Sequence, residues 1–237
     1  MTKCTKCFAA VCFSFASLFG YTEQSIAQQN PVTAVDILLL PDATMLSHAK
    51  SVNANHLKVY PQGFALDATH RPHLTMIQRF VRSTDLDKVY AAVGKVIASA
   101  NVTGIKLEAF KYYYVPNGDV GVSGIVAKPT PELLKLQNDL ITAVAPFTVQ
   151  TGDSSAFFTT PDDPNIDPAL IDYVSTFVPK RSGDHFNPHV STGVAPRTYL
   201  DKLIAEPFEA FTFSPAGVAV YQLGQFGTAA KKLKEWN

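Results

Sequence analysis

The sequence predicts an α+β fold, and three observations support this class. β-type and helical segments follow one another in the order strand, helix, hairpin, helix, and then strand, helix and more strand. This order differs from the regular alternation that is typical of a doubly wound sheet. A predicted strand followed by a predicted helix occurs in each half of the chain, and this recurrence indicates a pseudo-symmetric pair of lobes. Finally, 46% hydrophobic and 17% charged residues are typical of an ordered globular protein.

The N-terminal segment is expected to lie outside this fold. Two lysines precede an uncharged apolar run at residues 8–20, and small residues stand at Ser25 and Ala27. This is the pattern of a secretory signal peptide. The run is short for a bilayer span, although an uncleaved anchor is the alternative. We therefore expect residues 1–27 to be a signal peptide, residues 28–237 to form the functional domain, and the protein to be secreted or periplasmic.

Cysteine content and charge limit the possible functions of this domain. All three cysteines lie in the leader, so residues 28–237 have no thiol for a disulfide, a thiolate metal site or a nucleophile. These residues carry 18 basic and 19 acidic side chains, a net charge of −1. No basic excess is present to hold a long nucleic acid by its phosphates. We expect a small phosphate-bearing ligand, no membrane contact after cleavage, and a monomer.

The first half of the domain is predicted to begin with a buried strand at residues 35–40, which ends at a Pro-Asp pair. The first part of 45–58 has helical spacing, and 74–81 is predicted as a strand. A Ser-Thr-Asp cluster then precedes helical periodicity over 86–100.

The rest of the chain is predicted to start with a hairpin, in which a Pro-Asn-Gly-Asp turn joins the strands 104–115 and 120–127. A helix follows and ends at residue 145. The Pro-Thr-Pro-Glu sequence at the start of this helix supplies its N-terminal cap. The remaining predicted elements are an ambiguous segment at 148–160, a polar loop at 161–168, a helix at 167–177, a strand within 185–194, a helix at 196–205, a strand or hairpin at 208–223 and a helix at 228–236.

Two four-residue strings repeat one pattern of proline, histidine, apolar residue and hydroxyl residue. They are Pro-His-Leu-Thr at 72–75 and Pro-His-Val-Ser at 188–191. Because residues i and i+2 of a strand face the same side, each string directs an imidazole and a hydroxyl toward one place. Two such pairs facing one another would provide two proton-transfer groups and two hydrogen-bond donors.

These groups match the requirements of phosphodiester cleavage. The reaction needs a base for the nucleophile, an acid for the leaving oxygen and donors for the non-bridging oxygens. Histidine suits the first two roles because its pKa lies near neutrality. Thr75 and Ser191 can donate hydroxyl hydrogens to the phosphate, and the scheme requires no metal.

The paired strings resemble those of the two-histidine (2H) phosphoesterase superfamily, which includes bacterial 2′-5′ RNA ligase-like proteins and cyclic phosphodiesterases. The flanking sequences are similar too: RPHLTMIQRF at 71–80, FNPHVS at 186–191 and VAVYQLG at 218–224. The resemblance covers most of the chain from about residue 35. Ser191 stands where threonine is commoner, and the hydroxyl is retained.

The resemblance implies a bilobal fold, with two antiparallel sheets around a central cleft and helices outside. It implies that His73 and His189 are the catalytic acid and base, in an order left open, and that Thr75 and Ser191 bind phosphate. By analogy, Tyr221 is a possible substrate-binding residue. The implied activity is metal-independent hydrolysis of a cyclic or RNA-terminal phosphodiester, of the 2′,3′-cyclic phosphodiesterase type, without a cofactor.

Alternative interpretations remain open at this stage. His70 with His73, or His185 with His189, could be metal ligands, but the intervening prolines disfavour a helical metal motif. Two other functions remain: 2′-5′ RNA ligase activity, and a non-catalytic exported module that binds a nucleotide or phosphate. The arginines that could hold a phosphate are Arg71, Arg79, Arg181 and Arg197, and the aromatic runs that could stack on a base are 112–114 and 157–158.

Overall fold

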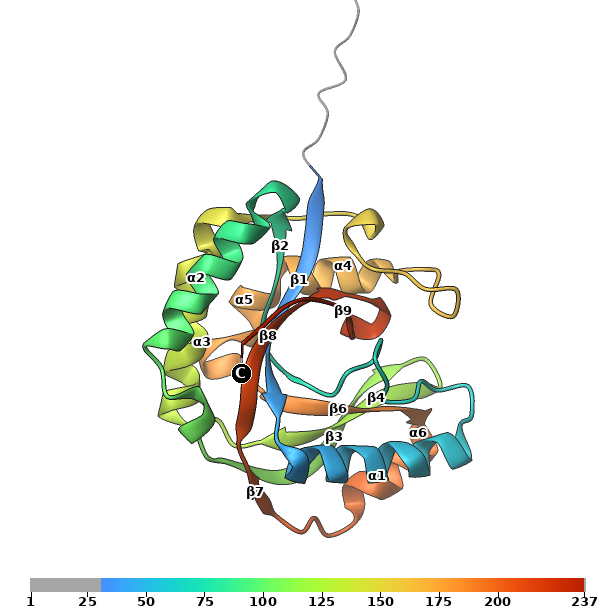
Figure 1. Ribbon diagram of the computed structural model, residues 1–237. Helices are drawn as coiled ribbons and strands as arrows, with labels where there is room; N and C mark the ends of the chain where they lie inside the picture. Colours follow the sequence, from blue (N-terminus) through green and yellow to red (C-terminus); the bar gives the residue numbers. More distant parts are fainter. Residues whose placement is uncertain (1–30, 237) are drawn as a thin grey trace, which may run out of the picture.

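The computed structural model describes residues 31–236, and the predicted signal peptide therefore lies outside the described residues. These residues form a nine-stranded antiparallel sheet with helices outside it (Figure 1). Strands run in the order β7-β3-β4-β6-β2-β1-β8-β9, and β5 pairs with β2 beside this path. The α+β class predicted from the sequence is confirmed.

The strands have the following bounds: β1 Val32–Pro41, β2 Leu74–Arg82, β3 Leu107–Asn117, β4 Val120–Ala127, β5 Thr148–Val149, β6 His189–Pro196, β7 Phe211–Phe213, β8 Pro215–Leu223 and β9 Ala229–Trp236. The helices have these bounds: α1 Ala43–Val59, α2 Leu86–Ala98, α3 Pro131–Val144, α4 Pro168–Ser175, α5 Phe177–Arg181 and α6 Arg197–Ala205.

The two sheets implied by the resemblance are two halves of one sheet. One half contains β7, β3, β4 and β6, and the other contains β2, β1, β8 and β9. A single residue pair, Leu74 of β2 with Val190 of β6, joins them. Both side chains are buried in the main hydrophobic core. The bilobal arrangement is therefore retained, and the two halves meet at the apolar residue that lies between the histidine and the hydroxyl residue of each motif.

The sheet curls strongly. Strands β7 and β8 are separated in sequence by Ser214 alone, yet β7 pairs with β3 at one edge and β8 pairs with β1 near the other. The edges must therefore approach each other. The Asp42 backbone N–H donates to the Ser214 carbonyl oxygen (3.0 Å), and the Ser214 N–H donates to the Asp42 carboxylate (2.8 Å). The backbone at Ser214 is thereby tied to the N-cap of α1.

Helices cover the outer faces of both halves. Figure 1 shows α2 and α3 side by side along the β2 half, with α1 and α6 beside β6 and β3 of the other half. Apolar residues of α2 and α3 join those of β1 and β2 in the main core. The short helices α4 and α5 pack against β2, and α4 covers a second cluster around Phe80 and Phe157. Within residues 31–236 no helix has the length and apolarity needed to span a bilayer.

Two predicted elements differ from the structure. The predicted helix at 228–236 is wrong, because this segment is β9, which pairs with β8. The open edge of β8 offers backbone partners to this segment, and that pairing overrides the helix propensity of its lysines and glutamate. Helix α1 also continues beyond the predicted first part to Val59. Its later turns bury Asn53 and His56, which interrupt the apolar pattern but bond to the second half of the sheet.

Candidate active site

The junction between β2 and β6 brings the two histidine motifs together. Because the strands are antiparallel and Leu74 lies opposite Val190, His73 lies on the Ser191 side of the junction and Thr75 on the His189 side. Leu74 and Val190 point into the core, so the residues before and after them point to the opposite face. All four polar residues line one cleft.

The two histidines are held in the same way. The Nδ1 of His73 lies 2.7 Å from the carbonyl oxygen of Arg71, and the Nδ1 of His189 lies 2.7 Å from that of Asn187. Because a carbonyl oxygen only accepts, each Nδ1 carries a hydrogen. A proline stands between histidine and acceptor in both motifs and favours extended backbone in the residue before it. In each ring, Nε2 is then the nitrogen left for proton exchange with a substrate.

The cleft has a volume of about 360 Å³, which suits a small-molecule ligand. One wall comes from Tyr113 of β3, whose ring meets the His189 ring edge-on at 4.7 Å between centroids. Gly124 of β4 makes this contact possible, because a Cβ there would lie 2.8 Å from the Tyr113 ring. Another wall comes from α4 and α5, where the Arg181 guanidinium lies 4.0 Å above the Tyr173 ring.

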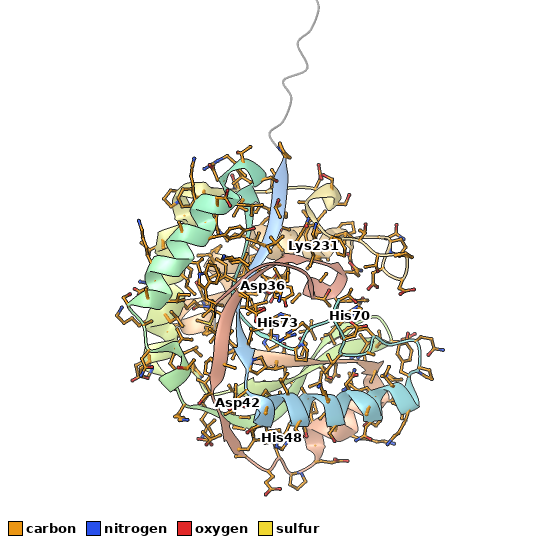
Figure 2. The ribbon with its side chains drawn as sticks, viewed as in Figure 1. Asp36, Asp42, His48, His70, His73 and Lys231 are labelled. Carbon is orange, nitrogen blue, oxygen red and sulfur yellow. The ribbon has the colours of Figure 1, made fainter. Side chains whose placement is uncertain are left out.

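A buried carboxylate lies beside the first histidine. Asp36 belongs to β1 and is fully buried. Its Oδ2 accepts hydrogen bonds from the Thr75 hydroxyl (2.7 Å) and the Gln78 side-chain amide (3.0 Å), and lies 3.4 Å from the Nε2 of His73. Figure 2 shows Asp36 and His73 near the centre of the molecule.

The two histidines differ in their electrostatic environment. For His73, burial lowers the pKa, but the polar contact and negative charge of Asp36, together with the Arg71 carbonyl, outweigh burial and raise the pKa above its usual value. For His189, burial dominates and lowers the pKa to about 4, against the opposing effect of the Asn187 carbonyl. The site therefore contains one histidine whose pKa is raised and one whose pKa is lowered.

The structure places the other predicted site residues as follows. Ser191 and Thr75 both line the cleft. They differ in that the Thr75 hydroxyl already donates a hydrogen bond to Asp36. Arg71 is exposed and lines a small cavity next to His73. Tyr221 of β8 lies opposite Asp36 of β1; it is only 3% exposed, packs in a cluster with Leu38 and is not among the residues that line the cleft.

The other members of the two histidine pairs considered as metal ligands, His70 and His185, have different surroundings. His70 lies between Asp67 (3.2 Å) and Asp163 (3.1 Å), where it links two loops. His185 lies on the wall of the cleft. In the described part of the chain, no three His, Cys, Asp or Glu side chains are grouped so that they could hold a metal ion.

The sequence interpretation missed Asp36 and its partner Gln78. A signal was present, because Asp36 is the single charged residue in the apolar run at residues 35–40. A charge in a buried strand requires a partner, so it indicates a polar site nearby. Of the four arginines considered for phosphate binding, Arg181 reaches the cleft, whereas Arg79 lies near Thr148.

No protein-family model and no curated protein matches this chain. Among solved structures, the chain is similar to LigT of E. coli in complex with phosphate, with 13% identity, a TM-score of 0.46, and coverage of 87% of this chain and 97% of LigT. It is similar to TT0787 of Thermus thermophilus, with 16% identity, a TM-score of 0.48, and coverage of 86% of this chain and 97% of TT0787.

A third similar structure is Usb1 of Kluyveromyces marxianus, with 11% identity, a TM-score of 0.40, and coverage of 86% of this chain and 98% of Usb1. In each of these three comparisons, the similarity extends over most of the length of both chains.

Proposed function

We propose that this protein is a metal-independent phosphoesterase that hydrolyses a small cyclic or RNA-terminal phosphodiester, of the 2′,3′-cyclic phosphodiesterase type. The observation that carries the proposal is the convergence of His73 and His189 on one cleft, each with its Nδ1 fixed by a backbone carbonyl. Two histidines that present Nε2 to one ligand can supply both the acid and the base of the reaction.

The lining of the cleft supports a small nucleotide-like substrate. Arg181 and the Ser191 hydroxyl provide a charge and a donor for phosphate oxygens. Aromatic side chains offer flat surfaces for a base: Tyr113, Tyr173, Phe177, Phe186 and Phe226. Phe226 is 39% exposed and adopts a left-handed backbone conformation (φ 60°), which is uncommon for a bulky residue and occurs preferentially at functional sites.

If an RNA hydroxyl replaced water as the nucleophile on a cyclic phosphate, the same breakage of a ring P–O bond would join RNA ends, so hydrolysis and 2′-5′ ligation would share this site. We favour hydrolysis because the cleft is small and the domain has no basic excess to hold two polynucleotide ends. We also propose that the protein acts outside the cytoplasm as a monomer. The proposed export rests on residues 1–27, which lie outside the described residues.

The test is an assay of the purified protein with 2′,3′-cyclic nucleotides in the presence of EDTA. We expect each cyclic nucleotide that is a substrate to yield a phosphomonoester, and EDTA to leave the rate unchanged. Replacement of either cleft histidine, in His73→Ala or His189→Ala, should lower the rate by about two to four orders of magnitude, the usual contribution of general acid–base catalysis.

The matched control is His48→Ala. His48 is exposed on α1, stacks on Phe211 and lies away from Asp36 and His73 in Figure 2, so this variant should retain the wild-type rate. Lack of turnover of any cyclic or RNA-terminal phosphodiester would contradict the proposal. Activity that requires a divalent metal would favour the metal-site interpretation, and tight nucleotide binding without turnover would favour the binding module.

A further inference from the structure

The carboxylate of Asp36 is unusual because it is completely buried within a hydrophobic strand. Its Oδ2 receives the Thr75 and Gln78 hydrogen bonds, while its Oδ1 has no hydrogen-bond partner among residues 31–236. Two neutral donors compensate a buried carboxylate only in part. The group that can balance its charge is the His73 ring, whose Nε2 lies 3.4 Å from Oδ2.

The two halves of the sheet can be compared residue by residue, because each motif strand has a register shift just after its hydroxyl residue. Aligning these shifts makes the following pairs equivalent: Leu38–Thr75 with Gly124–Ser191, Ile37–Ile77 with Ser123–Gly193, and Asp36–Gln78 with Val122–Val194. The polar pair beside the first motif is therefore replaced by two valines beside the second. His189 has no ion pair within residues 31–236.

We propose that Asp36 is a positioning residue that keeps His73 in its protonated form, so that His73 is the general acid and His189 the general base. The second part of this inference rests on the proposed function. The geometry suits an acid, because 3.4 Å is longer than a direct N–H···O hydrogen bond. Asp36 thus stabilises the cation while the Nε2 proton remains available to a leaving oxygen.

The pKa shifts agree with this assignment. Burial lowers the pKa of both histidines, and the nearby carboxylate reverses that shift only at His73. The other titratable or charged groups that line the cleft around this pair are Tyr113 on β3, Tyr173 on α4, Arg181 on α5, Asp167 at the start of α4 and His185 before β6. Burial is the main cause of the lowered pKa of His189, and the charges of His73 and Arg181 lower it further; the Asn187 carbonyl and the more distant charge of Asp36 raise it, but not enough to reverse the shift.

The resulting hydrolysis is balanced. The Nε2 of His189 takes a proton from water, and the water oxygen forms a new bond to phosphorus. One ring P–O bond breaks, and the Nε2 of His73 gives its proton to the departing oxygen. The product is a phosphomonoester with a free hydroxyl. His189 is then charged and His73 neutral, and exchange of one proton with solvent at each ring restores the starting state.

The first test is Asp36→Asn, which preserves the size of the side chain and an oxygen for the Thr75 hydroxyl but removes the charge. Titration of the histidine ring protons by NMR should show the pKa of His73 falling below 6.5, because only the weaker effect of the Arg71 carbonyl then opposes burial. In the pH profile of kcat/KM, the alkaline limb should move to lower pH. Each unit of that movement lowers the rate on the alkaline side about tenfold.

The second test is Val122→Asp, which places a carboxylate at the equivalent position of the other half, where the side chain is only half-buried. The pKa of His189 should rise, and the acid limb of the rate profile should move to higher pH. This variant keeps the inference testable if Asp36→Asn fails to fold, which circular dichroism would reveal.

The NMR readout needs no substrate and so separates this inference from the proposed function. Absence of turnover together with the expected movement of the His73 titration would reject the proposed function but support the role of Asp36 in holding the proton. An unchanged His73 titration in Asp36→Asn, or an unchanged His189 titration in Val122→Asp, would overturn the inference. Asp36 would then have only a structural role.

Discussion

The two halves of the sheet present the same motif geometry but opposite patterns of polarity. In the β1–β2 half, the polar pair Asp36–Gln78 lies on the cleft side, next to His73. In the β4–β6 half, the equivalent positions are valines, and the polar group lies instead on the side of α1. There Ser123 contacts His56 of α1 (2.6 Å) and Thr192 (2.7 Å).

This difference shows how a pseudo-symmetric scaffold can support an asymmetric reaction. Symmetry of the backbone places two imidazoles at one cleft, each with its Nδ1 bonded to a backbone carbonyl. A reaction that needs an acid and a base requires them to differ in protonation, and a single buried carboxylate on one side is sufficient to achieve this. In the other half, the polar cluster is covered by α1, where it holds the helix and does not line the cleft.

The largest expected effect comes from breaking the junction between the halves. Leu74→Ala removes a fully buried side chain at the one pair that joins β2 to β6. We expect the free energy of unfolding to fall by about 3 kcal/mol, within the range for leucine truncation in a core. Chemical denaturation measures this change. A loss below about 1 kcal/mol would show that the junction carries little of the packing between the halves.

A smaller effect concerns the polar cluster of the second half. Burial lowers the pKa of His56 to about 4, and its Nδ1 has no hydrogen-bond partner in the described part of the chain. Because the unfolded chain binds a proton near pH 6.5 and the folded chain does not, stability should fall as the pH drops from 6.5 toward 4. At pH 5 the loss due to His56 should be about 2 kcal/mol.

The measurement compares urea denaturation at pH 7.5 and pH 5 in the wild type and in His56→Gln, which can still bond to Ser123. The difference in stability between the two pH values should be smaller in the variant by about 2 kcal/mol. The exposed His48→Gln provides the matched control and should behave as the wild type. Equal acid sensitivity of His56→Gln and wild type would contradict the buried neutral state.

The smallest predicted effect distinguishes the two hydroxyl residues. Ser191→Ala removes a donor directed to the cleft, and we expect kcat/KM to fall about tenfold, as for one hydrogen bond to a charged group. Thr75→Val removes a hydroxyl that already donates to Asp36, so its effect on kcat/KM through phosphate binding should be smaller. Equal falls in kcat/KM would show that Thr75 turns from Asp36 to the phosphate when substrate binds.

The sequence is sufficient to predict the fold class, most elements and the two motifs, because periodicity and the repeated strings are local signals. It does not reveal the role of β9, since Lys, Leu and Glu favour a helix until the edge of β8 becomes available. The pairing of Asp36 with Thr75 is also hidden, because it joins residues 39 positions apart across two strands. The distinction between Asp36 and Val122 requires the register of both halves.

The pH dependence of kcat/KM for a 2′,3′-cyclic nucleotide, measured in EDTA, tests the central claim most directly. Two histidines of opposite protonation state should give a bell-shaped profile. The acid limb should lie near pH 4, where His189 becomes charged, and the alkaline limb should lie above pH 6.5, where His73 loses its proton. A profile with one limb, or a bell that is unchanged in His73→Ala and His189→Ala, would contradict the account.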